Sequence, residues 1–287
     1  LNLGKGPAVH SLRAQIDRNH YSRLMKHKLE TCPNLLLRQG EIVKLEREGE
    51  EWLLTSRLEA VYRAKASSSP RGRFLGGKVF VGDVSYESGP DGMFPAAFLP
   101  DSLKELGISL RRFKTGTPAR VLKSSIDFSG WRSSTATSYC PLLLRHGGAF
   151  GEQGRLPCQL DQRRHQASDL GEHPPLSPVR RHDRGVGPRY CPSIEDKVVR
   201  FAGKDRHPIF VEPCGENTEE MYLQGASSSL PEDVQNAFYR SIKGFENIEI
   251  MRPAYAIEYD CVDPTSLEAT LESKVVRGLY GAGQFNG

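Results

Sequence analysis

The chain has 287 residues, of which 38% are hydrophobic and 26% are charged, and its formal net charge is +4. This length can bury one large core or two smaller ones. No apolar run approaches the roughly 20 residues that a membrane-spanning helix needs, and the first residues lack the pattern of a secretory signal. We therefore expect a cytoplasmic protein with no membrane segment, whose mild positive charge permits a nucleic-acid partner without requiring one.

Hydrophobic periodicity divides the first part of the chain into short elements. Residues 11–30 have apolar positions at near-helical spacing and predict a helix that ends before Pro33. The alternation that follows predicts short strands, and a short helix precedes a strand that enters a tight turn. The predicted strands are residues 35–37, 42–45, 52–55, 60–64 and 78–81, the helix is 102–106, and the turn is 116–118.

The middle of the chain, residues 131–184, has no helical or strand periodicity. Arginines recur through it among prolines and histidines, which is typical of a disordered basic linker or of an RNA-binding arm. Regular patterns return after it with two helix starts, which Ser193 and Ser229 would cap. The tail predicts a buried strand at residues 278–280 and then a glycine turn.

The six cysteines form no C-x-x-C pair, and their spacing matches no common zinc site. A disulfide framework is not expected in a chain of this length without a secretory segment. We therefore expect free thiols, most of them inert, and no metal site among Cys32, Cys140, Cys158, Cys191, Cys214 and Cys261.

Short motifs carry the chemistry that can be interpreted from residue types alone. The G-A-G-Q turn after the tail strand lets cofactor phosphates approach the backbone, but such an exit is also a common structural feature. Cys191 lies between two prolines next to Arg189, which would favour its thiolate; the competing interpretation is a buried structural thiol. Residues 114–118 fit a phosphate-binding loop or an ordinary tight turn, and core packing accounts for most of residues 252–264.

Several stretches, in chain order, resemble the glucose-inhibited division protein A family (GidA/MnmG), whose members are flavoproteins that modify tRNA. They are LGKGPAVHSLRAQIDR, FLGGKVFVG, LRRFKTGTPARV, IDFSG, GVGPRYCPSIEDKVVRF, SSSLPEDVQ, RPAYAIEYD and AGQFNG. The resemblance covers most of the chain and implies an α/β fold. This fold is a glutathione-reductase-like, FAD-binding Rossmann domain, expected at residues 1–112 and 275–287, interrupted by an inserted α+β nicotinamide-binding domain at residues 113–274.

The resemblance also implies site residues. Cys191 corresponds to a cysteine that is implicated in catalysis, and the segment around it corresponds to the stretch that binds NAD(H). That segment consists of Gly187, Pro188, Arg189, Tyr190, Cys191, Pro192, Ser193, Ile194, Glu195, Asp196, Lys197, Val198, Val199, Arg200 and Phe201. The residues that match FAD contacts, a glutamine with its glycine neighbours and two residues earlier in the chain, are Gln284, Gly283, Gly281, Ile42 and Ala96.

The family reaction adds a carboxymethylaminomethyl or aminomethyl group to carbon 5 of the wobble uridine of tRNA. Methylenetetrahydrofolate supplies the one-carbon unit, glycine or ammonium supplies the amine, and FAD reduced by NADH carries the redox step. The family works as a homodimer that joins a GTPase partner, MnmE, in a heterotetramer. The resemblance implies the same cofactors and partners for this chain, and no metal.

The chain also departs from the family pattern. The glycine-rich FAD fingerprint would precede residue 1, and the chain stops inside the flavin motif at Gly287, so we expect an internal fragment. Where the family has a buried strand, residues 67–73 read SSSPRGR, which predicts a weakened or missing strand. A one-base shift of reading frame can restore the family pattern there and before Gly185. We hypothesise that residues 67–73 and 131–184 are frameshifted and that the middle block is poorly packed, which resequencing the coding DNA would test.

Three other interpretations compete with this one. A related folate- and FAD-dependent tRNA uracil methyltransferase shares the fold, but the intact PRYCPSIEDK and AIEYD stretches argue against it. A non-catalytic basic RNA-binding module would rest on residues 155–184 and predicts an affinity for nucleic acid that falls sharply with salt. A zinc-stabilised domain would rest only on the scattered cysteines.

Overall fold

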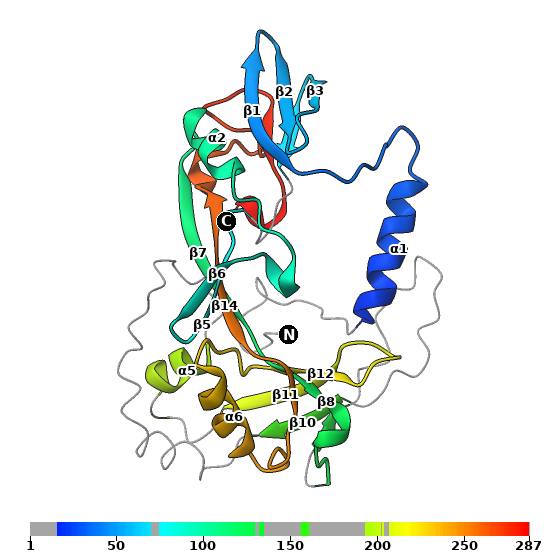
Figure 1. Cartoon of the computed structure of the whole chain (residues 1–287), viewed down its shortest axis with the longest axis vertical. Coiled ribbons are helices and arrows are strands. Elements are labelled where there is room, and N and C mark those ends of the chain that lie inside the picture. The colour runs from blue at the N-terminus through cyan, green and yellow to red at the C-terminus, as the bar shows by residue number, and fades with distance from the viewer. Residues whose placement is uncertain are drawn as a thin grey trace.

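The computed structural model describes residues 16–69, 75–129, 132–134, 156–160, 193–201, 203 and 207–286. Cys191 and the rest of residues 187–192 lie outside this part, as does most of the block 131–184. The described chain forms two halves, joined by the long strands β7 (Leu110–Thr117) and β14 (Tyr255–Val262), which run from one half to the other (Figure 1). The fold is therefore a mixed α/β arrangement with two centres of packing.

The first described elements are helix α1 (Arg18–Glu30) and a three-stranded antiparallel sheet. Asp17 caps α1 by accepting a hydrogen bond from the amide of His20 at 2.7 Å, and residues 11–15 of the predicted helix lie outside the described part. Three of the predicted strands are confirmed as β1 (Ile42–Glu48), β2 (Glu51–Ser56) and β3 (Val61–Ala64). The strand predicted at residues 35–37 is wrong, because that segment pairs with no described strand and its leucines are exposed. A strand forms only where a neighbour completes its hydrogen bonds.

The second sheet is antiparallel, in the order β6-β5-β14-β7. It contains β5 (Lys78–Val81), as predicted, and β6 (Val84–Glu87), an edge strand exposed along its whole length. The ladder between β14 and β7 continues from Tyr255 opposite Thr117 to Val262 opposite Leu110. The turn predicted at residues 116–118 is wrong in its first two positions, because Gly116 and Thr117 still belong to β7.

A short parallel pair consists of β4 (Ser67–Ser69) and β15 (Leu279–Gly281). β15 confirms the tail strand to within one residue, and Leu279 is buried as predicted. The SSSPRGR stretch was predicted to hold a weakened or missing strand, and β4, only three residues long, agrees with the first of these alternatives. Serine retains the backbone donor and acceptor that a ladder needs, and the proline that would remove a donor comes after the strand, at position 70.

The lower half is built on a six-stranded antiparallel sheet in the order β13-β8-β12-β11-β10-β9. Two of its strands fall inside the block 131–184, so the absence of strand structure inferred there is wrong for residues 132–134 and 156–160. β9 and β10 pair with neighbouring strands through backbone hydrogen bonds, which do not require apolar side chains, so the pattern of apolar side chains did not predict them. The strands are β8 (Arg120–Leu122), β9 (Arg132–Ser134), β10 (Leu156–Leu160), β11 (Pro208–Pro213), β12 (Glu220–Gln224) and β13 (Ile250–Arg252).

The remaining helices are short. Ser193 caps α5 (Ile194–Arg200) as predicted, through a capping box with Asp196. Ser229 does not cap α6 (Glu232–Arg240), because Pro231 occupies the N-cap position and no side chain caps the helix. The upper half contains α2 (Leu99–Glu105), which confirms the predicted helix. The 3-10 helices are η3 (Pro90–Gly92), η4 (Lys123–Ser125), η6 (Pro264–Ser266) and η7 (Gly283–Asn286). In the described part of the chain, no helix is long and apolar enough to cross a bilayer.

Each half has its own hydrophobic core. The upper core includes Leu45, Trp52, Leu75, Ala96, Leu99, Leu103, Val262, Leu267, Leu279 and Phe285. The lower core includes Ala119, Val121, Ile209, Val211, Leu223, Tyr239, Phe245, Ile248 and Ala254. Because the lower core begins at Ala119 and ends at Ala254, we propose that the chain crosses between the halves at β7–β8 and at β13–β14. The boundary predicted from the sequence, at residue 274, stays a prediction; Val262 and Leu267, which precede it, pack in the upper core.

Candidate functional site

The first part of the candidate site is the edge at which the parallel strands β4 and β15 end. Ligands of open α/β sheets bind beyond the carboxyl ends of parallel strands. Gly281 is the last residue of β15, and the chain turns directly into η7 (Gly283–Asn286). Gly283 has a φ of 69° and an open environment, since a Cβ built there meets no atom within 4 Å. Gly283 and Gln284 are both exposed, so this turn presents backbone and one amide side chain to the edge.

The glycine that ends β15 is required by close packing. A Cβ on Gly281 would collide with the side-chain oxygen of Asn286, whose Nδ2 donates to the carbonyl of Gly281 at 3.3 Å. The Oδ1 of Asn286 is buried and has no hydrogen-bond partner among the described residues. Phe285 between them is 2% exposed and anchors the turn in the upper core. An unsatisfied acceptor in a turn with exposed glycine backbone suits a polar ligand with donor groups.

The two earlier residues that the sequence predicts to contact flavin, Ile42 and Ala96, lie against the same core. Ala96 is buried, and its carbonyl accepts a hydrogen bond from the amide of Gly76 at 3.0 Å. Ile42 is partly buried and packs against the core that contains Leu279 and Phe285. The structure thus brings residues from four distant stretches of the chain to one core. Ala96 would contribute backbone and shape, because its methyl group is already covered.

Arg112 ties this region to the central ladder. Its Nη1 donates to the carbonyl of Gly76 at 2.7 Å and to the Oδ1 of Asp260 at 3.0 Å, and its Nε donates to Glu258 at 3.1 Å. Burial raises the pKa of Asp260 above its ordinary value, although the guanidinium of Arg112 opposes this shift. Gly76 has a φ of 55°, and a Cβ there would lie 2.6 Å from the Oδ2 of Asp260, so the position requires glycine. β7 and β14 therefore hold the segment that carries Ala96.

The second part of the candidate site is α5, which contains the described end of the predicted nicotinamide segment. The serine loop (residues 225–230) holds this helix by three contacts. The amide of Ile194 donates to the carbonyl of Ser227 at 2.7 Å, and the Nζ of Lys197 donates to the carbonyl of Gly225 at 2.6 Å. The hydroxyl of Ser228, which is almost fully buried, donates to the carboxylate of Glu195. The start of α5, three residues after Cys191, is therefore fixed.

The serine loop also contacts the upper half. The amide of Gly82, in the turn between β5 and β6, donates to the carbonyl of Ser229 at 2.7 Å. A Cβ on Gly82 would lie 2.8 Å from the Cγ of Pro231, and a Cβ on Gly116 would lie 3.3 Å from the Cβ of Ser227. These close approaches place the start of α5 beside the ladder that leads to the upper half. We call the turn at residues 281–284, where FAD is expected to bind, the flavin edge. Residues 187–192, which include Cys191, lie outside the described part, so their approach to the flavin edge stays a prediction.

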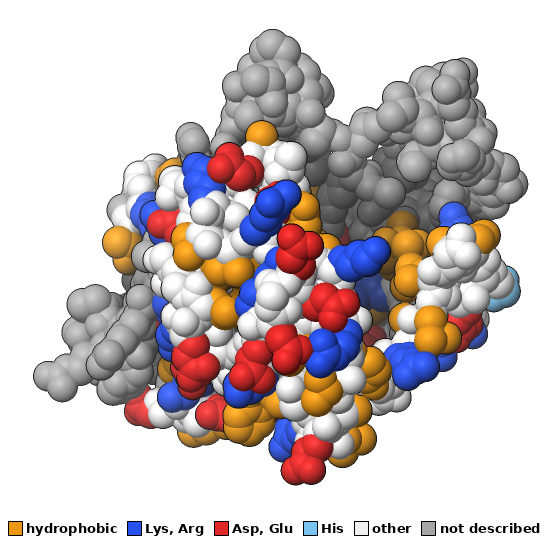
Figure 2. Space-filling model, turned by 90° about the horizontal axis from the view of Figure 1, so that it is seen from above, with side chains coloured by type: hydrophobic (Ala, Val, Ile, Leu, Met, Phe, Trp, Pro, Cys, Tyr) orange, Lys and Arg blue, Asp and Glu red, His pale blue; other side chains and the backbone are white. Residues whose placement is uncertain are grey.

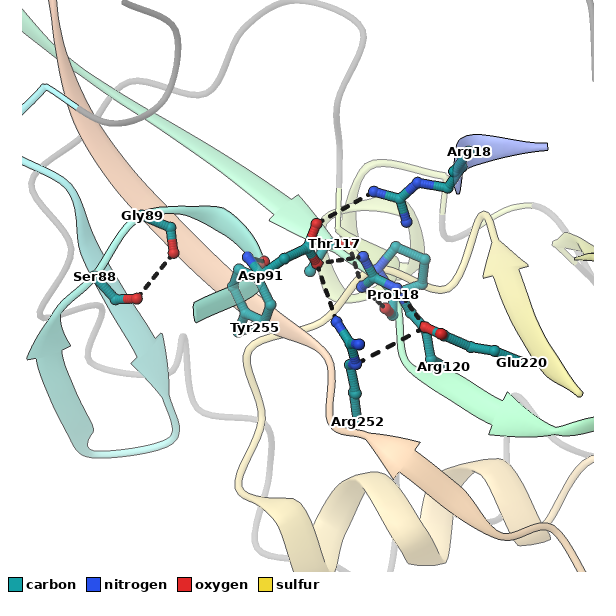
Figure 3. A network of polar contacts seen from close by, with 10 residues as sticks. All are labelled: Arg18, Ser88, Gly89, Asp91, Thr117, Pro118, Arg120, Glu220, Arg252 and Tyr255. Atoms are coloured by element: carbon teal, nitrogen blue, oxygen red, sulfur yellow. Dashed lines mark hydrogen bonds and ion pairs between the residues drawn. The ribbon is translucent and has the colours of Figure 1, made fainter. Parts of the chain in front are cut away.

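A polar network lies where the two halves meet (Figure 3). Asp91, in η3, is at its centre: its carboxylate faces Arg120 at 3.0 Å, Arg18 at 3.2 Å and Arg252 at 3.7 Å. Its amide donates to the hydroxyl of Tyr255 at 3.0 Å. The sequence analysis did not predict this network, because the sequence Pro-Asp-Gly around Asp91 indicates only a turn. The hint in the sequence was that Arg18, Arg120, Arg252 and Tyr255 fall in stretches that carry the family resemblance, although Asp91 itself does not.

Burial makes two of the described thiols unreactive in the folded chain. Cys214 and Cys261 are free and buried, and burial raises the pKa of both, that of Cys261 to about 11. Cys32 is free and exposed. Among the described residues, no group of three His, Cys, Asp or Glu side chains could hold a metal ion. A surface pocket of about 400 Å³ between β1 and α2, lined by Val43 and Phe98 among others, does not include Ile42 or Ala96.

These features define the class: a mixed α/β protein with two packed halves joined through β7 and β14, and an exposed glycine turn beyond the parallel pair of β4 and β15. The family model described as "Glucose inhibited division protein A" matches residues 1–287. The chain belongs to this family. The α/β fold class predicted from the sequence is confirmed by the crystal form II structure of Aquifex aeolicus GidA, with a TM-score of 0.84 and 38% identity over 100% of this chain and 47% of that chain.

Curated relatives carry a more specific name. The chain is 51% identical to the tRNA uridine 5-carboxymethylaminomethyl modification enzyme MnmG of Caldicellulosiruptor saccharolyticus, over 100% of this chain and 46% of that protein. The enzyme of the same name from Clostridium botulinum is also 51% identical, with the same coverage. The chain therefore spans about half the length of the curated relatives that it matches.

Proposed function

We propose that this chain is part of an FAD- and NADH-dependent enzyme that modifies tRNA. The enzyme adds a carboxymethylaminomethyl or aminomethyl group to carbon 5 of the wobble uridine, with methylenetetrahydrofolate as the one-carbon donor. The observation that carries the proposal is 51% identity, along the whole chain, to relatives named for this modification. By the same resemblance the enzyme acts in the cytoplasm, as a homodimer that forms a heterotetramer with the GTPase MnmE.

The flavin edge supports the cofactor part of the proposal. Gly281, Gly283 and Gln284 would hold FAD at the end of β15, and Ile42 and Ala96 would shape its surroundings. The fit rests on the exposed left-handed backbone of Gly283 and on the buried, unsatisfied Oδ1 of Asn286. FAD, when bound, supplies the redox chemistry of the reaction. The residues of the chain supply a rigid turn, a dry apolar base and hydrogen-bonding groups.

The nicotinamide part of the proposal rests on α5 and the segment before it. Residues 187–201 would bind NAD(H), and the serine loop would hold the start of α5 against the central ladder. Cys191 is our proposed catalytic residue, acting either by thiolate addition to the uracil ring or by proton transfer. In the addition, Sγ bonds to the ring carbon next to carbon 5, and the electron pair of the ring double bond makes carbon 5 nucleophilic. Carbon 5 would then bond to the one-carbon unit as the bond from that unit to the folate nitrogen breaks, and loss of the carbon 5 proton with departure of the thiolate would restore the ring double bond.

The test is Cys191→Ser in the whole enzyme, with Cys32→Ser as the matched control, because Cys32 is an exposed free thiol. Wild type and both variants should purify with bound flavin, seen by its visible absorption. Cys191→Ser should lower tRNA modification by roughly a thousandfold or more, and the control should keep full activity. Retained modification in Cys191→Ser removes Cys191 from the mechanism. Wild-type protein that binds no flavin contradicts the cofactor proposal itself.

The alternative of a non-catalytic basic RNA-binding module gains no support from the face that Figure 2 shows, and most of residues 155–184, on which it rests, lie outside the described part of the chain. Figure 2 views the molecule from the end that carries the three-stranded sheet of β1, β2 and β3. On this face, acidic and basic side chains are interleaved rather than separated. Ion pairs of that region show the same mixing: Lys44–Glu46, Arg57–Glu41, Arg63–Glu48 and Arg63–Glu51. RNA binding driven by phosphate contacts needs positive charges that acidic neighbours do not cancel.

A further inference from the structure

Asp91 combines a rare backbone conformation with a concentration of charge. It has a φ of 56° and a ψ of 29°, in the left-handed region that a residue other than glycine seldom adopts. Such a conformation persists only where the surroundings hold it. Here the hydroxyl of Tyr255 accepts from its amide, and three arginines surround its carboxylate. Nothing in the proposed chemistry uses this residue.

The partners of Asp91 sit at both crossings between the halves. Arg120 begins β8, directly after the first crossing, and also donates to the Oγ1 of Thr117 at 2.8 Å and to the carbonyl of Pro118 at 3.0 Å. Arg252 ends β13, directly before the second crossing, and Tyr255 begins β14 after it. Asp91 itself belongs to the upper half, in the loop between β6 and α2. One carboxylate thus bridges the upper half to both connections (Figure 3).

The burial of Arg120 determines which contact matters most. The side chain of Arg120 is 3% exposed, whereas those of Arg18 and Arg252 are each 52% exposed. Exposed ion pairs contribute little to the structure, but a buried guanidinium that loses its carboxylate is left with an uncompensated charge. Without Asp91, the carboxylate that still forms an ion pair with Arg120 among the described residues is that of Glu220, 3.8 Å from its Nε. The junction would then have to open to water.

We propose that Asp91 is a positioning residue that sets the orientation of the lower half, with its nicotinamide segment, relative to the flavin edge. The proposal rests on the proposed function in one respect: the distance that it controls is the one across which NADH reduces the flavin. Hydride transfer needs its two carbon atoms in near contact, so a small rotation at the junction lowers the rate without removing either binding site. A misplacement of about 1 Å can cost about a hundredfold in rate.

The experiment uses Asp91→Asn and Asp91→Gly in the FAD-loaded whole enzyme. Both variants lose the negative charge and both accept a left-handed backbone, since asparagine tolerates it and glycine has no Cβ. The control is Asp101→Asn, which removes an exposed carboxylate that forms an ion pair with Lys104 of the same helix. The measurements are the flavin absorption spectrum, the dissociation constant of NADH, and the anaerobic rate of flavin reduction at saturating NADH.

We expect an unchanged spectrum and an NADH dissociation constant within about twofold of wild type in both variants. We expect the reduction rate to fall by about tenfold to a hundredfold in both, and to stay at the wild-type value in Asp101→Asn. Wild-type reduction rates in Asp91→Asn and Asp91→Gly overturn the proposal. So does loss of bound FAD or of NADH binding in both, because Asp91 would then support folding rather than orientation.

A second measurement separates this proposal from the proposed function. Hydrogen exchange of the backbone amides at residues 118–122 and 250–255 should be at least about tenfold faster in Asp91→Asn than in Asp101→Asn, because the junction opens more often. This result does not depend on NADH. If wild-type flavin is not reduced by NADH, the proposed function is wrong, and exchange alone decides whether Asp91 holds the junction. Equal exchange in the two variants overturns the positioning role.

Discussion

Gln235 provides a stringent test of how the serine loop is held. The side chain of this α6 residue is fully buried, and its amide makes three hydrogen bonds. Its Nε2 donates to the carbonyls of Leu230 at 2.7 Å and Ala254 at 2.9 Å, and its Oε1 accepts from the amide of Ala254 at 2.7 Å. One side chain therefore joins the end of the serine loop to the residue directly before β14.

Replacement of Gln235 by methionine keeps the volume and removes all three hydrogen bonds. It leaves the amide of Ala254 and the carbonyls of Leu230 and Ala254 buried without their partner. A buried polar group without a partner costs about 1–3 kcal/mol, and such costs do not add fully, so we expect a loss of about 3–5 kcal/mol in the free energy of unfolding. That is a large share of the roughly 5–15 kcal/mol by which domains are stable.

The assay is urea unfolding followed by far-ultraviolet circular dichroism, with the free energy taken by linear extrapolation. The matched control is Asn236→Leu, at the next position of the same helix, where the side-chain amide donates only to the exposed carbonyl of Glu232. This control should change the free energy of unfolding by no more than about 0.5 kcal/mol. If Gln235→Met is no more destabilising than Asn236→Leu, the bridging role assigned to Gln235 is wrong.

Two further predictions concern backbone strain and thiol chemistry. Gly82→Ala should destabilise the fold by at least about 1 kcal/mol more than Gly49→Ala in the same unfolding assay. Both glycines have a positive φ, of 56° and 60° respectively, so the backbone strain of the two substitutions is matched. Of the two, only Gly82 would place its new Cβ against another residue, Pro231. Equal costs would mean that the serine loop moves away freely. Alkylation of the native chain, followed by mass spectrometry, should modify exposed Cys32 well before buried Cys261, whose pKa is raised to about 11. Because the folded pKa is raised, Cys261 stabilises the fold fully below its ordinary pKa, and this contribution is lost as the pH rises from about 9 through about 11. Modification of Cys261 at the rate of Cys32 at neutral pH would contradict its burial.

The hypothesis of a shifted reading frame stays a prediction. The structure contains a strand at residues 67–69 and two strands within residues 131–184, so the residue composition of these stretches did not predict their strand pairing. Backbone pairing does not show what the coding DNA contains. Resequencing remains the direct test.

Local signals in the sequence determined the elements that depend on neighbours along the chain. The alternation of apolar residues in residues 42–64 predicted the strands β1, β2 and β3. Ser193 followed by Asp196 predicted the start of α5, because a helix cap needs only residues within one turn. The stretches around Cys191, Gly281 and Gln284 were sufficient to predict the family. Leu35–Leu37 misled because their apolar character says nothing of a partner strand, and Ser229 misled because Pro231 occupies the cap position.

Only the tertiary structure decided how distant residues meet. The hydrogen bonds of Gln235, the contact of Gly82 with the serine loop, and the convergence of Arg18, Arg120 and Arg252 on Asp91 join residues far apart in sequence. No periodicity encodes such contacts, because they depend on where whole strands lie rather than on local propensity. The sequence by itself determined the family and most of the local elements. The fold decided which carboxylate compensates a buried arginine, because burial is a property of the folded chain.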